Sequence, residues 1–395
     1  MIPRRRIYGV KEDFGLILQY LFSRRDAAAD PVADFEQAFR DFTHAGHAVA
    51  VSSGRTGLKF ILMSLDLKRG DEVILPAYTL KDILYIIQSL CLKVVLADID
   101  PLTFNISPES VSERITDRTR VILATHMFGA PCEVDRLVRI AADRRIALIE
   151  DCAHAACSFY RGKHAGSFGH AAFFSFESIK PVNTYGGGMV ITGDPDFAAR
   201  IRRLRGSRVN KFPFRKIAVA AAENILLPGP VSAPFLYLLS LPSWHETVEK
   251  IYRMSQRSGL RQGGMAPLQA EIGIRKLSSL KERVGLIREK ASYLVSLLSP
   301  DIQVQHMLEH AEANYYFFVV KVPDRLCEVR RYLLSRGIDA GVGSEVTDDC
   351  SAYLRERECV NAREVFSRAL QLPLHYGMDR SSIRFVADAL NAFYQ

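Results

Sequence analysis

The stretch that decides the fold is Phe173-Phe174-Ser175-Phe176-Glu177-Ser178-Ile179-Lys180, which leads into Thr184-Tyr185-Gly186-Gly187-Gly188-Met189-Val190. An apolar, aromatic strand ends near one lysine, and a loop with three glycines connects it to a second short strand at 189–192. Burial disfavours the charged form of a lysine, which prepares the amine to act as a nucleophile. The glycines let the backbone approach a ligand closely. We therefore expect Lys180 to form a Schiff base, whereas a lone lysine here would simply extend into solvent.

Strands and helices alternate along the residues before this stretch. Apolar strands are predicted at 48–52, 72–75, 93–97, 120–125 and 146–150, and helices at 58–65, 83–91, 133–144 and after Ser107. Because the strands are apolar on both faces, the pattern predicts an α/β fold with a large, mostly parallel sheet and helices on both faces. Ligands in such folds bind beyond the carboxyl ends of the strands. The turn at Gly54, Asp151 and Lys180 all fall there.

The second half of the chain follows a different pattern. A helix at 195–205 is followed by residues 207–260, which are first basic and then apolar. A long helix is predicted at 267–298, a strand at 315–322, and helices at 326–336, 362–370 and 383–393. These elements predict a smaller C-terminal α+β domain. The expected division is an N-terminal arm and helix (1–47), a large domain (48–206), an insertion (207–260), and an interdomain helix with the small domain (261–395).

Composition narrows the class of protein. The 395 residues carry a net charge of +8, and the basic clusters lack a nucleic-acid motif, so they indicate solvated surface and no nucleic-acid partner. The seven cysteines are scattered without a Cys-x-x-Cys pair, which argues against a zinc site or a disulfide framework; no metal is expected. Early charges after the first arginines argue against a signal peptide. We expect a cytoplasmic protein.

Two apolar segments leave alternatives open. Residues 14–25 combine an apolar run with arginines, which is typical of a helix that lies on a membrane and equally of an arm that packs on a partner subunit. Residues 217–241 are apolar but interrupted by Glu223 and three prolines, too broken for an ordinary membrane span. For this second segment we expect a buried insertion, a hydrophobic interface with a partner, or peripheral membrane contact.

Several polar residues accompany Lys180 at the predicted sheet edge. Asp151 ends a buried strand, where a carboxylate can hold a proton on a heterocyclic nitrogen, and His154 follows it. Ser175 offers a hydroxyl, and the turn Gly54-Arg55-Thr56 opens a helix whose free N–H groups favour an anion. Each feature is common by itself. Together, a lysine amine, a carboxylate and a phosphate cradle match the needs of pyridoxal 5'-phosphate.

The chain also resembles the DegT/StrS-type (DegT/DnrJ/EryC/StrS) sugar aminotransferases, pyridoxal-phosphate enzymes of the aspartate-aminotransferase fold (fold type I). Motifs such as Ser52-Ser53-Gly54-Arg55-Thr56-Gly57-Leu58 and Ile149-Glu150-Asp151-Cys152-Ala153-His154 carry the resemblance. The matching stretches occur in family order at 52–58, 70–79, 98–101, 104–106, 126–129, 149–154, 174–180, 265–269 and 372–374.

The resemblance implies a role for each site residue. Lys180 would hold the cofactor covalently and later move a proton, and Asp151 would pair with the pyridinium nitrogen. His154, where the family often has glutamine, would lie near the phenolic oxygen of the ring. Ser175, Arg55 and Thr56, in the turn that starts at Gly54, would hold the phosphate. The family forms dimers with shared active sites, and Gln262 takes the place of the partner-subunit asparagine that reaches the phosphate.

The chain departs from the family pattern at three places. Leu80 stands where an aromatic residue usually stacks on the cofactor ring, with Tyr78 nearby. Arg261-Gln262-Gly263-Gly264 replaces the usual Tyr-Asn-Tyr-Arg, and Gly343-Ser344 follows Val342 without the expected histidine. The last two changes lie where the substrate would be held, and with the apolar insertion they allow an amphiphilic or lipid-linked substrate.

These observations predict a homodimeric pyridoxal-phosphate aminotransferase. It would move an amino group from glutamate to a keto sugar, most simply a nucleotide-linked one, in cell-surface polysaccharide or secondary-metabolite biosynthesis. Two alternatives stay open: another fold-type-I activity, such as a lyase or a decarboxylase, and a non-catalytic regulatory protein that keeps the cofactor pocket.

Overall fold

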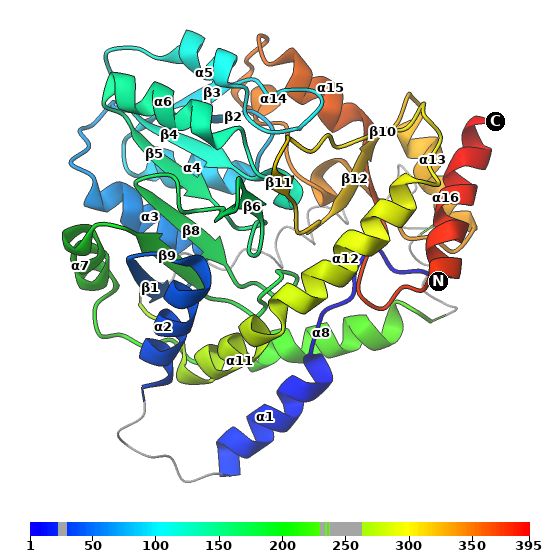
Figure 1. Ribbon diagram of the computed structural model, residues 1–395, viewed down its shortest axis with the longest axis horizontal. Coiled ribbons are helices and arrows are strands. Elements are labelled where there is room, and N and C mark those ends of the chain that lie inside the picture. Colours follow the sequence, from blue (N-terminus) through cyan, green and yellow to red (C-terminus); the bar gives the residue numbers. More distant parts are fainter. Residues whose placement is uncertain (23–29, 230–233, 235–236, 238–262) are drawn as a thin grey trace.

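A seven-stranded sheet forms the centre of the large domain in the computed structural model, which describes residues 1–22, 30–229, 234, 237 and 263–395 (Figure 1). The strand order is β1-β9-β8-β5-β4-β2-β3. The strands are β1 (His47–Val51), β2 (Glu72–Pro76), β3 (Lys93–Ala97), β4 (Thr119–Thr125), β5 (Ala147–Asp151), β8 (Ala171–Ser175) and β9 (Gly188–Thr192). Only β9 runs antiparallel to its neighbours, so the predicted mostly parallel sheet is confirmed.

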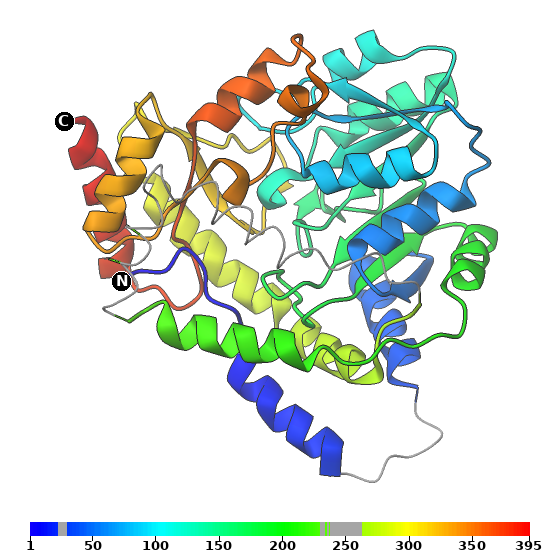
Figure 2. The same cartoon turned by 180° about the vertical axis from the view of Figure 1, so that it is seen from behind.

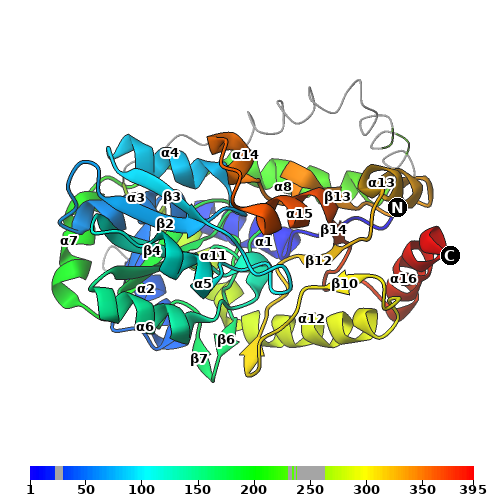
Figure 3. The ribbon, with the colours of Figure 1, turned by 90° about the horizontal axis from the view of Figure 1, so that it is seen from above.

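Helices cover both faces of this sheet, as the alternation predicts. One face carries α3 (Gly54–Ser64), α4 (Lys81–Ser89) and α7 (Pro195–Arg205), which are seen in front of the sheet in Figure 2. The other face carries α2 (Pro31–Thr43), α5 (Pro108–Arg114), α6 (Val134–Arg144) and α11 (Pro267–Ser278). Figure 3 shows α4 and α6 on opposite sides of the sheet. This is the α/β architecture expected of fold type I.

An aromatic cluster locks α2 onto the strand that leads to Lys180. Asp30 caps α2 by accepting hydrogen bonds from the N–H groups of Val32 and Ala33. Phe39 is fully buried, and its ring centroid lies 4.9 Å from that of Phe174 in β8. Phe39 also lies 5.6 Å from Phe176. Because these rings interdigitate, α2 fixes the course of the chain just before the lysine.

The C-terminal domain is built on a smaller antiparallel sheet of order β10-β12-β14-β13. Its strands are β10 (Gln303–Val304), β12 (Phe318–Lys321), β13 (Gly341–Val342) and β14 (Ala369–Leu372). A shared apolar core joins this sheet to α12 (Leu280–Val295), α13 (Leu326–Ser335) and α16 (Arg380–Tyr394). The remaining elements are β6 (Phe159–Tyr160), β7 (Lys163–His164) and β11 (Ala311–Glu312), which form a third sheet, α14 (Cys350–Leu354), α15 (Val360–Arg368), and the short 3-10 helices Met127–Gly129 and Gly343–Glu345.

Three predicted elements differ in the structure. The helix expected at 267–298 is two helices, α11 and α12, which meet at Ser279 and follow one diagonal line in Figure 1. The helix expected at 362–370 ends at Arg368, because the following residues are fully buried as strand β14. The strand expected at 315–322 shrinks to β12, since Tyr315 has a φ of 49° that no strand accepts.

Two helices with apolar surfaces lie side by side at the edge of the molecule. α1 (Val10–Phe22) contacts α8 (Phe214–Leu226) and α11 (Figure 1). α8 buries Ile217 and Ala220, whereas Ile225 and Leu226 are exposed. Residues 23–25 and most of 230–241 lie outside the described residues, so neither alternative for these segments is tested. No described helix has the length and apolar character needed to cross a membrane. The division into domains stays a prediction.

Candidate active site

The predicted site segments meet at one edge of the large sheet. Asp151 is the last residue of β5 and Ser175 the last residue of β8, and these strands are parallel neighbours. Lys180 follows in the loop between β8 and β9. α3 begins at Gly54 because the side chain of Ser53 accepts a hydrogen bond from the N–H of Thr56. The structure therefore brings the lysine, the carboxylate and the helix-opening turn to one edge.

Glycine at position 54 allows the first turn of α3 to lie directly on β8. A Cβ atom there would lie 3.0 Å from the Cβ of Ser175 and 3.2 Å from the carbonyl oxygen of Phe174. The first-turn N–H groups of a helix have no partner inside the helix and favour an anion. Arg55 is held beside this turn by Asp82, with 2.5 Å between Nη1 and Oδ2. The turn and Ser175 therefore lie side by side, and the phosphate cradle expected of them stays a prediction.

The Lys180 amine is prepared for nucleophilic attack. Burial lowers the pKa of Lys180 from 10.5 to about 7. The negative charges of Asp151 and Glu177 oppose this effect, whereas the positive charge of Arg55 adds to it. A substantial fraction of the side chain is therefore neutral near pH 7, as a Schiff-base lysine requires.

Asp151 sits in an equally unusual environment. Burial raises the pKa of Asp151 to about 6, against the opposing effects of the Ala153 N–H group and of Lys180 and His126. The N–H of Ala153 donates to Oδ1 over 2.9 Å. A buried carboxylate of this kind gains stability from a nearby cation, which a protonated heterocycle would provide.

His154 and Tyr316 form a stacked pair next to the lysine. Their ring centroids lie 4.3 Å apart with the planes inclined by 20°. Burial and the charge of Lys180 lower the pKa of His154 well below its usual value, so its ring is neutral. Its Nδ1 atom is buried and has no hydrogen-bond partner among the described residues. Leu80 is 44% exposed and Tyr78 is buried against Phe128, whereas the rings stacked on His154 are those of Tyr316 and Phe128.

These residues fit pyridoxal phosphate. Asp151 would hold the protonated ring nitrogen, and the unpartnered Nδ1 of His154 offers a polar contact for the phenolic oxygen. The first turn of α3 and Ser175 would hold the phosphate. Lys180 supplies the amine for covalent attachment. Gln262, the remaining predicted site residue, lies outside the described residues.

A buried polar group lies behind Asp151. Ligand atoms of His126, Glu150 and Cys152 fall within 4.8 Å of one another, a spacing that a metal could use. Hydrogen bonds already engage Glu150 and His126, however: the Glu150 carboxylate accepts from His126 Nε2 over 2.9 Å and from the N–H groups of Gly166, Phe168 and Gly169. The cluster is therefore accounted for as a structural network that supports the end of β5.

Sequence reasoning missed two participants of this site. Tyr316 lies in the bend before β12, and Glu177, three residues before the lysine, is held by Lys216 of α8, whose Nζ lies 2.8 and 2.7 Å from its two carboxylate oxygens. The paired tyrosines at 315 and 316 were visible in the sequence, but nothing local linked them to Lys180. Both contacts join segments far apart in the chain.

The comparison with protein families agrees with this geometry. The model of the DegT/DnrJ/EryC1/StrS aminotransferase family matches residues 11–229 and 231–391. The chain belongs to this aminotransferase family. The resemblance stated from the sequence is confirmed, and so is the assignment as an aminotransferase of a family of pyridoxal-phosphate enzymes.

Solved structures of DegT/DnrJ/EryC1/StrS aminotransferases share the fold along the full chain. A putative sugar aminotransferase, Spr1654 from Streptococcus pneumoniae, in its PMP form, is 20% identical with a TM-score of 0.79 and covers 99% of this chain and 98% of its own. DesV of S. venezuelae, in complex with a ketimine intermediate, is 24% identical with a TM-score of 0.76. The match covers 100% of this chain and 99% of DesV. DesI, in the presence of its TDP-sugar product, is 25% identical with a TM-score of 0.73. The match covers 99% of this chain and 92% of DesI.

Proposed function

We propose that this aminotransferase carries an amino group from glutamate to a keto sugar that is linked to a nucleotide. The observation that supports it most is the proximity of two groups with shifted pKa values: Asp151 at the end of β5, with a pKa of about 6, and Lys180 in the loop after the neighbouring strand β8, with a pKa of about 7. Perturbed pKa values of a buried amine and carboxylate cluster at catalytic sites. The TDP-sugar product of DesI supports the nucleotide link. The product would serve polysaccharide or secondary-metabolite biosynthesis.

Each residue has a defined task in this proposal. Pyridoxal phosphate supplies an aldehyde that condenses with amines and a ring that withdraws electrons. Lys180 moves a proton to and from the carbon that carries the amino group, since its amine is partly neutral at neutral pH. Asp151 holds a proton at the ring nitrogen, His154 orients the ring, and the first turn of α3 with Ser175 binds the phosphate.

The decisive experiment follows the colour of the purified protein with pyridoxal phosphate. We expect a yellow species that bleaches to the pyridoxamine form with glutamate and regains colour with a keto sugar nucleotide. Lys180→Ala should abolish both changes while the circular dichroism spectrum stays that of a folded protein. Colour without bleaching by glutamate would support a lyase or a regulatory protein and overturn the proposed function.

We also propose that the protein is a homodimer whose α1 helices are covered by the partner subunit. Phe14, Leu18, Leu21 and Phe22 form one exposed apolar stripe on α1, at helical spacing. A stripe of this kind marks an interface. Leu18→Asp with Leu21→Asp should then convert dimer to monomer in analytical ultracentrifugation. A double variant that stays dimeric but no longer floats with anionic liposomes would overturn this assignment and establish membrane contact.

A further inference from the structure

The loop that follows Lys180 is held by side chains from helices far away in the sequence. Asn183 and Thr184 are fully buried, so their carbonyl groups need hydrogen-bond partners inside the protein. The Nζ of Lys276 in α11 donates to the carbonyl oxygen and to Oδ1 of Asn183, each over 2.8 Å. The amide of Gln269, also in α11, donates to the carbonyl oxygen of Thr184 over 3.0 Å. The loop therefore depends on α11 for the hydrogen bonds of its buried backbone.

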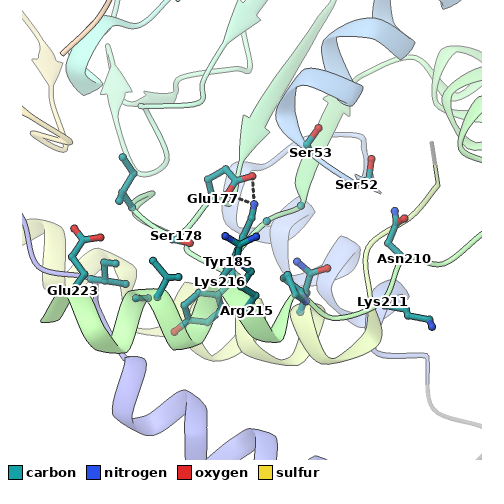
Figure 4. Close-up of a pocket in the computed structure, with 18 of the residues that line it drawn as sticks. Ser52, Ser53, Glu177, Ser178, Tyr185, Asn210, Lys211, Arg215, Lys216 and Glu223 are labelled. Atoms are coloured by element: carbon teal, nitrogen blue, oxygen red, sulfur yellow. Dashed lines mark hydrogen bonds and ion pairs between the residues drawn. The ribbon is translucent and has the colours of Figure 1, made fainter. Parts of the chain in front are cut away.

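Two further helices hold the chain on either side of the lysine. The guanidinium group of Arg283 in α12 donates to the carbonyl oxygen of Pro181 over 3.2 Å. On the other side, Lys216 of α8 binds the carboxylate of Glu177, as Figure 4 shows. Lys180 therefore lies between two anchored segments, and the loss of an anchor would change where its amine is held.

Asp13 of α1 orients the ammonium group of Lys276. Asp13 is fully buried and Lys276 is 1% exposed, and 2.5 Å separates Asp13 Oδ2 from the Nζ atom. An ammonium group has three N–H donors. The two oxygen atoms of Asn183 and the carboxylate of Asp13 provide an acceptor for each of them. The orientation of Lys276 is therefore set in part by a residue of the N-terminal arm.

The same carboxylate holds a second point of the loop. The hydroxyl of Tyr185 donates to Asp13 Oδ2 over 2.5 Å. Tyr185 is fully buried and has a φ of 62°, in the left-handed region that side chains other than glycine rarely adopt. A backbone of this kind persists where surrounding contacts fix it, and such residues cluster at active sites. Asp13 therefore holds Tyr185 directly and Asn183 through Lys276.

We propose that Asp13 and Lys276 are positioning residues for Lys180. They act through the loop and not on the reacting atoms, by fixing the backbone from which the lysine reaches the cofactor. The inference rests on the role proposed for Lys180. It gives the N-terminal arm a part in the reaction, because the loop loses two of its anchors without these side chains.

Variants of the buried pair separate positioning from stability. Asp13→Asn leaves the ammonium group of Lys276 without its partner and should lower both stability and activity. Asp13→Asn combined with Lys276→Met removes both charges, and a buried ion pair replaced by neutral side chains often costs little stability. The double variant should therefore melt nearer to the wild type than Asp13→Asn does. It should stay impaired in the reaction, because the donors to Asn183 are gone.

Three measurements on the pyridoxal-phosphate-loaded protein test the proposal. In a single turnover with glutamate, the rate constant of the double variant should fall about tenfold or more, with little change in the half-saturating concentration. The visible circular dichroism of the bound cofactor should weaken, since it reports how rigidly the cofactor is held. Hydrogen exchange of the amides at 182–187 should accelerate. Tyr185→Phe keeps the ring, removes one contact to Asp13 and should show the same changes to a smaller extent.

Glu72→Gln is the matched control. Glu72 is also buried, and its carboxylate lies 3.0 Å from the Nζ of Lys93. It lies at the start of β2, at the edge of the parallel sheet opposite to the site. Its replacement should lower stability without changing the rate constant, the visible dichroism or the exchange at 182–187.

Two results would overturn the proposal. One is a double variant that matches the wild type in all three measurements. The other is an equal effect of Glu72→Gln, which would show that any lost ion pair impairs the reaction. A wild-type protein that does not react with glutamate would count against the proposed function instead. The dichroism and the hydrogen exchange would then still decide the positioning role, because neither needs an amino donor.

Discussion

The Nζ atom of Lys180 lies 4.3 Å from the centre of the Tyr316 ring, and the same ring stacks on His154. A tyrosine from the small domain therefore joins the reactive amine to the histidine of the large domain. The face of an aromatic ring attracts a cation, so this contact favours the protonated form of the lysine. Burial acts in the opposite direction and prevails, which sets the pKa of Lys180 at about 7.

Cofactor uptake by the apo protein should depend on pH through Lys180. Below about pH 7 the amine is protonated and cannot attack an aldehyde, and above it the neutral form dominates. The rate of Schiff-base formation, followed by absorbance, should rise with pH and level off above about 7 instead of near 10.5. Asp151→Asn removes a charge that raises the pKa of the lysine, so its midpoint should move to lower pH. A midpoint that moves upward in this variant would contradict the assignment.

Replacing Tyr316 by leucine should also shift this midpoint downward. Leucine keeps the lysine buried but removes the aromatic face that stabilises its charge. The expected shift is about one pH unit or less. Tyr316→Phe keeps the ring and serves as the control, with a midpoint close to that of the wild type. Equal midpoints for the leucine and phenylalanine variants would show that the ring does not act on the amine.

Truncation of Phe39 should strongly destabilise the large domain. Its side chain is fully buried between Phe174 and Phe176, so Phe39→Ala leaves a cavity. We expect a loss of about 3–5 kcal/mol in the free energy of unfolding by urea. Val360→Ala is the control, because that side chain is 59% exposed and its truncation should change the stability by about 0.5 kcal/mol or less. Comparable losses in both variants would contradict the packing described.

A buried ion pair lies under the active-site loop, and we expect the stability lost on breaking it to depend on pH. Asp13 of α1 lies 2.5 Å from the Nζ of Lys276, which also donates to Asn183 in the loop after Lys180. Asp13→Asn leaves this ammonium buried without its partner and should cost about 3–5 kcal/mol near pH 7.

The sign of the pH effect follows from Lys276. Burial lowers its pKa to about 8 even with Asp13 in place, and removing Asp13 lowers it further. The unfolded chain then binds a proton that the folded variant does not, so the stability of the variant rises with pH. The deficit measured by thermal unfolding should be smaller at pH 9 than at pH 6.5. Glu12→Gln, at the exposed neighbouring position, should show neither effect.

Local patterns in the sequence were sufficient to predict the fold of the large domain and the edge of the sheet at which the site lies. The alternation of apolar strands and helices predicted the sheet, and the position of Asp151 and Lys180 after buried strands predicted that they meet. Both inferences depend only on periodicity and on the geometry of parallel sheets. The start of α3 followed from residues 53–56 alone, since a helix start is encoded by its cap.

The features that could not be predicted from the sequence depend on packing between segments far apart in the chain. Residues 369 and 370 continue a helical pattern locally, but they lie in β14, which is buried between β12 and β13. The contact of Tyr316 with Lys180 depends on how the two domains meet, and the Glu177–Lys216 pair depends on where α8 lies. Such contacts leave no trace in the neighbouring residues.

The placement of β1 has a consequence for synthesis of the chain on the ribosome. β1 is a terminal strand of the large sheet, and its only partner in that sheet is β9, in which Thr192 pairs with His47. The helix that would receive the phosphate follows β1, and the lysine precedes β9. During synthesis, β1 therefore stays unpaired until β9 has left the ribosome, and its exposed edge can associate with other chains in the meantime. The edge of the sheet that carries the site is complete only when β9 pairs with β1, so we expect a chain halted before residue 192 to be unable to retain pyridoxal phosphate.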